Sequence, residues 1–451
     1  MSTALIILAA GQGTRMNSEL PKVLHAIAGA PMLGHAMQAG ATLDPDHVIV
    51  VAGHGAEAVR KAALDFDEAA QIVLQTEQLG TAHAVAQAAP LLTKYSGDAL
   101  VLYGDTPFIQ PETLARMQAA RASHDIVVLG FEAADPGRYG RLVTDGETLL
   151  RIVEFKDATE DERAITLCNS GVIMAPCALL FELIAQVGNA NAAGEYYLTD
   201  IVGLARAQGL SATAVTCHEA ETMGINSRAE LAQAEAAFQA RKRAEALETG
   251  VTLTAPETVH FAYDTWLGRD CMVEPYVVFG PGVTIETGAH IRAFSHLEGC
   301  HVARGAVVGP YARLRPGTEL SEHARIGNFV EVKNALIGEG AKVNHLSYIG
   351  DASIGDESNI GAGTITCNYD GVSKHTTVIG ARVFVGSNTM LVAPVTLGDG
   401  AMTGSGSVIT RNVAPDALAI ARAPQVDKPG RARKLFDLLK AKALKRDKGA
   451  D

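Results

Sequence analysis

The stretch that decides the fold reads I-G-E-G-A-K from residue 337, I-G-D-E-S-N from 354 and L-G-D-G-A-M from 397. An aliphatic residue recurs along it with a period of six, as in the run Val308, Leu314, Leu320, Ile326 and Val332. A period of six fits no helix and is the signature of a parallel β-helix, in which each hexapeptide supplies one strand and one tight turn. We expect three hexapeptides to complete a triangular coil. The aliphatic side chains then point inside, and a continuous core forms only when coils stack.

Length and composition limit the remaining possibilities. A chain of 451 residues is too long for one core and should form at least two domains. The net charge of −12 argues against nucleic-acid binding. The longest early apolar run, residues 4–10, is too short to span a membrane, and the six cysteines form no C-x-x-C pair. We therefore expect a cytoplasmic protein without integral membrane contact, whose thiols are reduced.

A glycine-rich turn lies close to the start of the chain. Residues 4–8 are continuously apolar, which is typical of a strand buried on both faces of a parallel sheet. The sequence A-A-G-Q-G-T-R-M follows directly at residues 9–16. Bare backbone amides in such a turn can cradle a phosphate. The Lys-Ser/Thr pair of a P-loop is missing, and Met16 replaces the third glycine of the dinucleotide fingerprint. A tight turn without a ligand is the alternative.

The first half of the chain alternates between strand-like and helix-like segments. Apolar runs at residues 48–52, 100–103 and 126–129 are separated by Ala- and Leu-rich stretches, which predicts a doubly wound, Rossmann-like α/β sheet. Ligands of such sheets bind beyond the carboxyl ends of the strands. Asp105 lies at such an end and could hold Mg²⁺ against a triphosphate. A carboxylate that only caps a turn explains Asp105 equally well.

The two halves are joined by a predicted long helix. Ser227 and Glu230 form a capping box, and the following residues contain no Gly or Pro until Gly250. We interpret this helix as a rigid connector. The predicted domains are accordingly residues 1–226, a helical linker at 227–250, and a β-helix domain with a C-terminal tail at 251–451.

Several features interrupt the hexapeptide pattern. The spacing of aliphatic residues shortens by one from Val332 to Ile337 and from Ile349 to Ile354. Residues 366–378 leave the period altogether, which predicts a projecting loop. The cations Arg315 and Lys333, the pair His345 and Tyr348, and Arg422 after the last repeat do not serve the repeat itself. Taken singly, a surface histidine in a solenoid is more often structural than catalytic.

Two sets of motifs resemble known families. L-A-A-G-Q-G-T-R-M with the following L-P-K resembles the signature of sugar-1-phosphate nucleotidyltransferases, and Gln75–Thr81 resembles their uracil-reading segment. G-N-F-V-E-V-K from residue 327, H-L-S-Y-I-G-D from 345 and G-A-G-T-I-T-C-N-Y-D-G from 361 are similar to segments of bacterial bifunctional N-acetylglucosamine-1-phosphate uridyltransferases/glucosamine-1-phosphate acetyltransferases. The resemblance to this bifunctional family covers nearly the whole chain.

The resemblance implies an architecture, two activities and their sites. The second domain would be a left-handed β-helix, and the chain a homotrimer with acetyl-CoA sites between subunits. Acetyl-CoA would acetylate glucosamine-1-phosphate with His345 as the base. UTP would then convert the product into UDP-N-acetylglucosamine, the amino-sugar donor for bacterial envelope polymers. Arg15 and Lys22 would hold phosphates, and Mg²⁺ would be bound by Asp105 and Asn226.

The remaining site residues follow from the same motifs. The nucleotide and sugar-nucleotide positions would be Leu8, Ala9, Ala10, Gly11, Arg15, Lys22, Gln75, Gly80, Thr81, Tyr103, Gly104, Asp105, Gly140, Glu154, Asn169 and Asn226. Glucosamine-1-phosphate would contact Arg315, Lys333, Tyr348 and Asn359. Acetyl-CoA would contact Ala362, Asn368, Tyr369, Ser387, Ser405 and Arg422.

Two other interpretations remain open. The chain could be a nucleotidyltransferase whose β-helix serves only assembly or regulation, but a spacer would not need His345, Lys333 and the Asn368-Tyr369 loop. It could also be a scaffold that has lost its activity, but Lys22, Asp105 and Asn226 are intact. The sequence therefore favours an enzyme with two sites.

Overall fold

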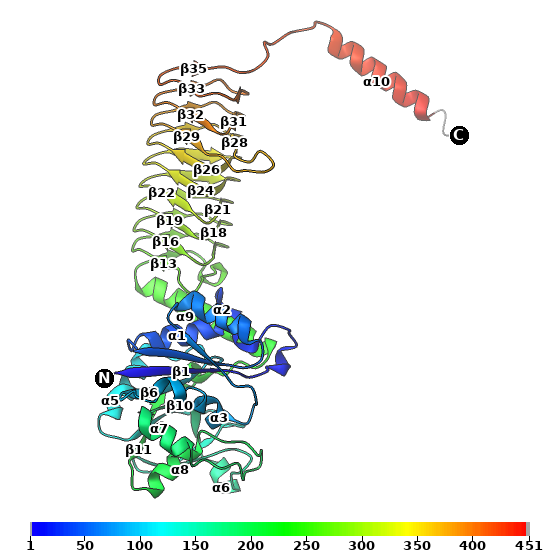
Figure 1. Ribbon diagram of the computed structural model, residues 1–451. Coiled ribbons are helices and arrows are strands. Elements are labelled where there is room, and N and C mark those ends of the chain that lie inside the picture. Colours follow the sequence, from blue (N-terminus) through cyan, green and yellow to red (C-terminus); the bar gives the residue numbers. More distant parts are fainter. Residues whose placement is uncertain (1, 448–451) are drawn as a thin grey trace. The chain divides into compact units, whose positions relative to one another are not determined.

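The computed structural model describes residues 2–447 and divides into two compact units. One unit holds the chain up to Ala246 together with His260–Thr265, and the other holds Leu247–Val259 and the chain from Trp266 onward. Figure 1 shows an α/β sheet in the first unit and a stack of coils in the second. Both predicted fold classes are confirmed. The predicted domain limits at residues 226 and 250 remain a prediction.

The first unit is built on a nine-stranded mixed sheet with the strand order β5-β4-β1-β6-β10-β7-β11-β9-β8. The interior strand β1 (Thr3–Ala9) is buried along its whole length and pairs in parallel with β4 (His47–Ala52) and β6 (Asp98–Tyr103). The other strands are β5 (Gln71–Leu74), β7 (Ile126–Glu132), β8 (Arg141–Asp145), β9 (Thr148–Val153), β10 (Leu167–Pro176) and β11 (Ala212–Cys217). Because β10 runs antiparallel to β6 and β7, the sheet is mixed.

Helices cover both faces of this sheet, as expected for a doubly wound fold. One face packs on α1 (Met32–Ala41), α2 (Ala56–Phe66) and α5 (Pro111–Arg121). The other packs on α3 (Thr81–Ala86), α4 (Ala89–Leu92), α7 (Cys177–Ile184) and α8 (Asp200–Ala207). Smaller elements complete the unit: η1 (Thr14–Met16), η2 (Lys22–Leu24), β2 (Ala26–Ile27), β3 (Ala30–Pro31), α6 (Glu160–Arg163) and η3 (Glu219–Thr222).

The predicted connector is helix α9 (Arg228–Glu248). The Glu230 amide donates to Ser227 Oγ at 3.3 Å, and the Ser227 amide donates to Glu230 Oε2 at 2.9 Å, so both halves of the capping box form. Phe238, on the apolar side of α9, packs with Ile27 and Met32. Much of the connector is therefore part of the first core.

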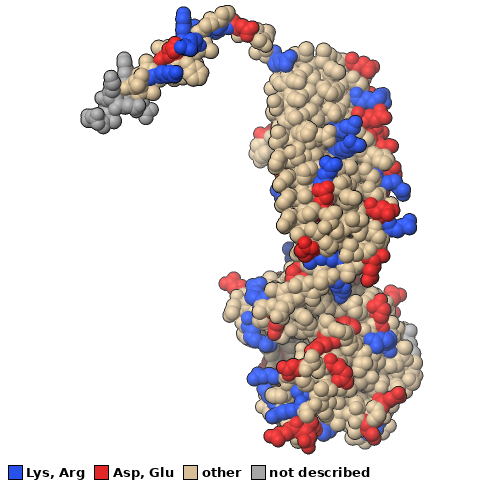
Figure 2. All heavy atoms as spheres, turned by 180° about the vertical axis from the view of Figure 1, so that it is seen from behind, with Lys and Arg blue, Asp and Glu red and all other residues tan. Residues whose placement is uncertain are grey.

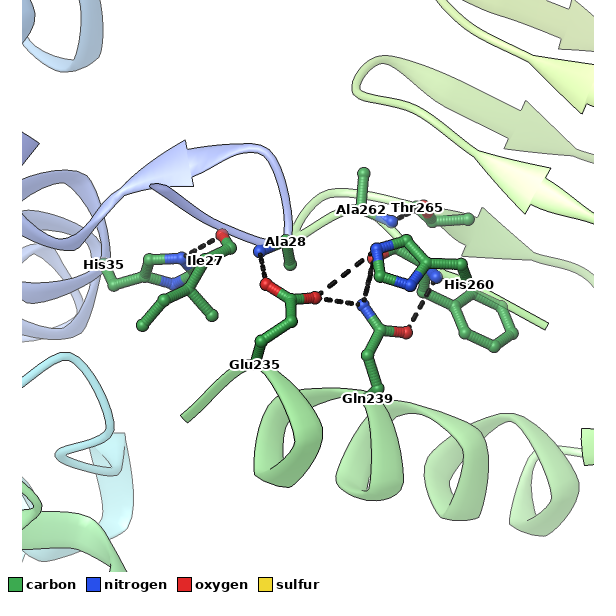
Figure 3. Close-up of polar contacts among 9 residues, drawn as sticks. Ile27, Ala28, His35, Glu235, Gln239, His260, Ala262 and Thr265 are labelled. Carbon is green, nitrogen blue, oxygen red and sulfur yellow. Dashed lines mark hydrogen bonds and ion pairs between the residues drawn. The ribbon is translucent and has the colours of Figure 1, made fainter. Parts of the chain in front are cut away.

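Two side chains of α9 hold the segment from His260 to Thr265, as Figure 3 shows. Gln239 donates to the Phe261 carbonyl at 2.7 Å and accepts from the Phe261 amide at 2.8 Å. Its side-chain amide thus bonds both backbone groups of Phe261, as a neighbouring β-strand would. Glu235 accepts a bond of 2.7 Å from the Ala28 amide in the turn between β2 and β3. Because both side chains have hydrogen-bond partners, the cost of removing them from water is largely offset.

The second unit is a parallel β-helix with three strand faces, visible as the coil stack in Figure 1. The first face is formed by β12 (Thr252–Leu253), β14 (Met272–Val273), β17 (His290–Ile291), β20 (Val307–Val308), β23 (Arg325–Asn328), β25 (Lys342–His345), β27 (Asn359–Ile360), β30 (Phe384–Val385), β33 (Met402–Thr403) and β35 (Leu418–Ala419).

The other two faces share the strands β24 (Glu331–Ile337) and β26 (Tyr348–Ile354), which continue around the corner between them. The second face also contains β15 (Val278–Phe279), β18 (His296–Leu297), β21 (Arg313–Leu314), β28 (Ile365–Cys367), β31 (Met390–Val392) and β34 (Val408–Ile409). The third contains β13 (Trp266–Leu267), β16 (Val283–Ile285), β19 (Cys300–Val302), β22 (Thr318–Leu320), β29 (Thr377–Ile379) and β32 (Val395–Leu397). A short turn, η4 (Pro256–Thr258), precedes them.

The corner between the first and second faces carries a ladder of aromatic rings. Tyr276, Phe294, Tyr311 and Phe329 stack on consecutive coils with centroid distances of 5.0, 4.9 and 5.3 Å. Each ring is about half exposed. We call these four residues the aromatic ladder. Figure 2 shows that much of one side of the β-helix is uncharged, with charged side chains gathered along an edge.

The chain continues after the last coil into helix α10 (Arg431–Asp447), whose large apolar side chains, such as Leu435 and Leu438, are exposed. Within residues 2–447, no helix is both long and apolar enough to cross a membrane.

Candidate functional site

The first site lies at the carboxyl ends of β1 and β6, where a doubly wound sheet places its ligands. A cavity of about 280 Å³ opens there. Its wall includes many of the predicted nucleotide-binding residues: Leu8, Ala9, Ala10, Gly11, Lys22, Gln75, Gly80, Thr81, Tyr103 and Asp105. It also includes Val23, Gln78, Ala84 and Glu195, which were not on the predicted list. The cavity thus gathers segments that are far apart in the sequence.

Lys22 is the centre of charge in this cavity. Its ammonium bonds to Asp105 Oδ2 and, at 3.0 Å, to Asn226 Oδ1. All three residues were predicted from motifs up to 204 positions apart. The side chains of Lys22 and Asp105 are only 13% and 20% exposed, so their attraction is weakly screened. The ammonium of Lys22 could bind a phosphate here, and the oxygens of Asp105 and Asn226 could bind a metal ion beside it.

The loop at Gly11 and Gly13 approaches Lys22 closely. Gly13 has φ +64°, and a Cβ there would lie 2.5 Å from Lys22 Cβ. Only glycine tolerates both conditions. Met16 is buried and anchors the loop, whereas the predicted phosphate ligand Arg15 is exposed and does not line the cavity. The backbone amides of the loop therefore remain near the cavity, as a phosphate cradle requires.

The residues predicted to contact the sugar lie beside Tyr103. A Cβ on Gly171 would lie 2.6 Å from the Tyr103 ring, and the Gly171 amide donates to Asn169 Oδ1 at 3.0 Å. Gly140 lies against the Glu154 carboxylate, and its carbonyl accepts from the Asn169 amide at 2.8 Å. Burial, with the charges of Asp105 and Glu154, raises the pKa of Tyr103. These residues extend the cavity site toward β10.

Glu154 is a half-buried carboxylate in this second part of the site. Burial raises its pKa, and the bond from Thr199 Oγ1 at 3.1 Å only partly opposes the shift. Asp200, Asp157 and Glu195 add like charge. Such a carboxylate is costly to the fold, which is typical of a group kept for binding.

Gly104 and Gln78 connect the strand ends to the first loop. The Gly104 amide donates to the Leu8 carbonyl at 3.0 Å, and Gln78 Nε2 donates to the Ala10 carbonyl at 2.9 Å. Gln78 lies within Gln75–Thr81, the segment that resembles a uracil-reading motif. Its place in that segment could have identified it as a site residue. Glu195 begins the segment E-Y-Y-L-T at residues 195–199.

The residues present fit a magnesium ion. Asp105 and Asn226 offer a carboxylate and an amide oxygen, the hard donors that Mg²⁺ prefers, and both point at the Lys22 ammonium. Within residues 2–447 no group of three or more His, Cys, Asp or Glu side chains forms a metal cage. Mg²⁺ is commonly bound by one or two protein oxygens plus substrate phosphates, so a two-donor site is sufficient.

The second site follows one column of the β-helix. Leu346, Gly363, Asn388 and Gly406 occupy one corner on successive coils, all with φ between +50° and +76°. Each donates its amide to the residue one coil earlier that directly precedes the corner: Asn328, His345, Ala362 and Ser387, at distances of 2.7–3.2 Å. Arg422 Nη1 continues the series by donating to the Ser405 carbonyl at 2.6 Å. The predicted base and four predicted acetyl-CoA residues therefore form a single line.

The predicted sugar-phosphate residues lie on the neighbouring face. Arg315 directly follows β21 and Lys333 lies inside β24, the neighbouring strand of the second face. The Arg315 amide donates to the Val332 carbonyl at 2.9 Å. Tyr348 begins the next strand of the same face. Asn359 is the exception, because it begins β27 on the first face. Arg315 Nη1 also bonds to Glu331 Oε1 at 2.8 Å, which holds the guanidinium against the coil.

The projecting loop brings further groups to this face. Asn368 is buried and donates to Asp351 Oδ2, whereas Tyr369 is 60% exposed. Burial alone would raise the pKa of Asp351, but the bonds from Asn334 and Asn368 and the Lys333 charge lower it.

Lys374 of the same loop lies beside Lys333. The sequence did not identify Lys374 as a site residue. Contact with the Lys333 ammonium lowers the pKa of Lys374. Two neighbouring ammonium groups are a strong attraction for a phosphate. No motif carried this signal, because the contact depends on how the loop folds back.

The fold and the two sites together define a class of protein: a transferase with one nucleotidyltransferase unit and one hexapeptide-repeat unit. Residues 5–179 match the MobA-like NTP transferase domain family, and residues 264–299 match the bacterial transferase hexapeptide family. Residues 296–399 match the GMPPB C-terminal domain family.

Full-length relatives give the particular family. The bifunctional protein GlmU of Ruegeria pomeroyi is 71% identical over 99% of this chain and 100% of its own. The bifunctional protein GlmU of Paracoccus denitrificans is 64% identical over 97% of this chain and 98% of its own. The chain belongs to the bifunctional GlmU family. A solved UDP-glucose pyrophosphorylase in complex with UDP-glucose is more distant, at 17% identity and a TM-score of 0.44 over 53% of this chain and 100% of its own.

Proposed function

We propose that the chain acetylates glucosamine-1-phosphate with acetyl-CoA and then transfers UMP from UTP to the product, which gives UDP-N-acetylglucosamine and pyrophosphate. Membership of the bifunctional family supports two activities in one chain. The observation that carries the assignment is the separation of two sites. Lys22 and Asp105 lie in a cavity of the first unit, and His345 lies in a column of the second.

Acetyl transfer needs a free amine, and the amine of the substrate is protonated at neutral pH. An imidazole, whose ordinary pKa is about 6.5, can accept that proton. His345 is exposed at the column and takes this role. The amine nitrogen then attacks the thioester carbonyl, a C–N bond forms, the C–S bond breaks, and coenzyme A leaves as the thiol. Arg315 and Lys333 bind the sugar phosphate and so orient the amine.

The line above His345 suits a long thioester substrate. Ala362, Ser387 and Ser405 follow it on successive coils, and Arg422 supplies a cation at the far end. Coils are spaced by about 4.8 Å, so the line offers an extended track for acetyl-CoA. Asn368 and Tyr369 border the track from the projecting loop.

Uridylyl transfer depends on position and charge more than on covalent catalysis. Lys22 and Arg15 hold phosphates of UTP, and the Gly11 and Gly13 amides cradle them. Gln75 and Gly80 border the uracil, and Glu154 and Asn169 bind the sugar hydroxyls. The phosphate oxygen of N-acetylglucosamine-1-phosphate attacks the α-phosphate in line, and pyrophosphate leaves. Mg²⁺ bound to Asp105 and Asn226 would neutralise the charge that develops on the phosphates.

A homotrimer is part of the proposal. Hexapeptide repeats and the half-exposed aromatic ladder support self-association, since a contiguous apolar surface on a monomer marks an interaction site. A closed threefold ring would place the column of one copy next to another copy. Sedimentation should give three times the protomer mass. A micromolar monomer with full acetyl transfer would contradict a shared site.

The substrates UTP and acetyl-CoA also argue for a cytoplasmic location.

The two assignments are tested by variants that should affect one activity each. Asp105→Ala should abolish pyrophosphate release and leave thiol release from acetyl-CoA near the parental rate.

His345→Ala should lower thiol release by roughly a hundredfold to ten-thousandfold, the usual contribution of a positioned base. Its KM for glucosamine-1-phosphate should barely change, because other residues hold the phosphate. Equal loss of both activities in either variant would contradict the separation of sites.

A β-helix that serves only assembly is the second interpretation. The line from His345 to Arg422 argues against it, since a spacer has no reason to align these groups on consecutive coils. Parental thiol release by His345→Ala would favour it.

A further inference from the structure

We propose that Asn328 is a positioning residue that fixes the tautomer and orientation of His345. The inference rests on the proposed function, because it concerns the base of acetyl transfer. His345 Nδ1 and Asn328 Oδ1 are 3.0 Å apart. The two residues are register partners in the parallel pairing of β23 and β25. Asn328 is thus the member of the column directly below the base.

The bond selects one neutral form of the imidazole. An amide oxygen accepts hydrogen bonds and cannot donate one, so the proton of neutral His345 must lie on Nδ1. The lone pair then lies on Nε2, the nitrogen that is free to take a proton from the substrate amine. Without this partner an exposed imidazole populates both tautomers and several rotamers. An aspartate at the same place would also orient the ring, but its charge would stabilise the imidazolium, so at low pH less of the ring would be free to accept a proton.

Asn328 is itself held from both sides. A Cβ on Gly327 would lie 1.9 Å from the Asn344 carbonyl oxygen, so the two coils approach closely where the preceding residue is glycine. Phe329 follows at the corner and stacks on Tyr311. The Leu346 amide donates to the Asn328 carbonyl at 3.1 Å. The backbone of Asn328 is therefore fixed before any substrate binds.

The charged groups that share a cavity with the pair come from β23 itself and from the end of β17. Asn328 and His345 line a cavity of about 330 Å³ together with Arg292 and Arg325. Tyr348 begins the strand that follows His345. No carboxylate is among the residues that line this cavity. A neutral amide as the orienting partner is consistent with a base that must stay unprotonated in order to act.

The test compares Asn328→Ala and Asn328→Asp with the parent. Asn412→Ala is the matched control, because Asn412 also makes one bond between coils, accepting from the Thr396 amide at 2.9 Å, at the corner between the second and third faces rather than at the column. Asn328→Ala should lower kcat for thiol release roughly ten- to a hundredfold, the range found when the hydrogen-bond partner of a metal-bound histidine is removed. The KM for glucosamine-1-phosphate should stay within about twofold. Asn328→Asp should recover much of kcat and move the acidic limb of the pH profile to higher pH. Asn412→Ala should keep both constants.

A direct readout separates positioning from a structural role. In protein labelled with ¹⁵N-histidine, the signals lost in His345→Ala identify this ring. They should show a proton on Nδ1 in the parent and a mixture of tautomers in Asn328→Ala. Unchanged kcat, or an unchanged tautomer, in Asn328→Ala would overturn the proposal. If His345→Ala also keeps parental thiol release, the base assignment fails as well. If only Asn328→Ala keeps it, the failure concerns Asn328 alone.

Discussion

Glu154 shows how a single side chain can oppose the fold that contains it. It is half buried among Asp157, Glu195 and Asp200, and burial raises its pKa. The folded state therefore binds the proton more tightly than the unfolded state. The resulting stability is present at low pH and is lost as the pH rises from the unfolded pKa through the folded pKa. At neutral pH the ionised carboxylate destabilises the first unit.

We predict that Glu154→Gln raises the melting temperature at neutral pH and weakens sugar binding. Glutamine removes the charge and can still accept the bond from Thr199. The difference in stability from the parent should shrink as the pH is lowered toward 4. A hydrogen bond to a charged group contributes about 1.5–3 kcal/mol, so the KM for N-acetylglucosamine-1-phosphate should rise roughly ten- to a hundredfold. Thermal unfolding and pyrophosphate release measure the two effects.

The matched control is Glu160→Gln on α6, an exposed carboxylate at a helix start. It should change neither the KM nor the neutral-pH stability by a comparable amount. A Glu154→Gln protein that is less stable than the parent at neutral pH would contradict the sign of the pKa shift.

Residue identities in the first site were predictable only through motifs. The spacing of Lys22, Asp105 and Asn226 does not by itself bring them together, because their contacts form only once the sheet is assembled. The resemblance supplied that information, and their roles remain predictions. Lys374 shows the limit of this route. Its position beside Lys333 follows from the path of the projecting loop, which no period or motif encodes.

At the scale of elements, the six-residue period predicted the β-helix because each aliphatic residue fills the same interior position of a coil. The shortened spacings also have a structural reason. At Val332–Ile337 and Ile349–Ile354, β24 and β26 pass the corner as continuous strands, with Asn334 and Asp351 at φ +45° and +48°. The period alone could not show which corners lack a separate turn.

The coils that carry Gly327 and Asn344 lie so close together that we expect Gly327→Ala to destabilise the β-helix. The new Cβ would lie 1.9 Å from the Asn344 carbonyl oxygen, so the coil must move. Such overpacking costs about 1–3 kcal/mol. The displacement would act on Asn328 and His345. We expect the β-helix to melt earlier and thiol release to fall at least about tenfold, with pyrophosphate release unchanged.

Gly288→Ala is the control for this change. Gly288 has φ +74°, but no atom lies within 4 Å of its added Cβ, so the substitution introduces backbone strain without a clash. It should cost less stability and leave thiol release near the parental rate. Equal behaviour of the two variants would contradict the packing argument.

At the scale of the whole molecule, the structure shows where a fragment of the first unit should end. Residues 1–226 contain the predicted nucleotide site, but Ala234 and Phe238 of α9 belong to the same core as Ile27 and Met32. Gln239 also holds Phe261 from the segment after the helix. We predict that a fragment of residues 1–265 folds and releases pyrophosphate. A fragment of residues 1–226 should melt at a lower temperature, since removing a buried phenylalanine side chain costs about 3–5 kcal/mol.

Unfolding of both fragments followed by circular dichroism, with pyrophosphate release as the activity, tests the boundary. Equal stability of the two fragments would show that α9 is only a spacer, as the sequence alone suggested.

The central claim is that one chain carries two reactions in a fixed order. The most direct measurement is incubation of the protein with glucosamine-1-phosphate, acetyl-CoA, UTP and Mg²⁺, with free thiol and pyrophosphate followed separately. Thiol should appear first, and pyrophosphate should follow after a lag that disappears when N-acetylglucosamine-1-phosphate is supplied directly. Omitting acetyl-CoA should suppress pyrophosphate release from glucosamine-1-phosphate. Pyrophosphate released without any thiol would contradict the account, because the β-helix would then have no catalytic role.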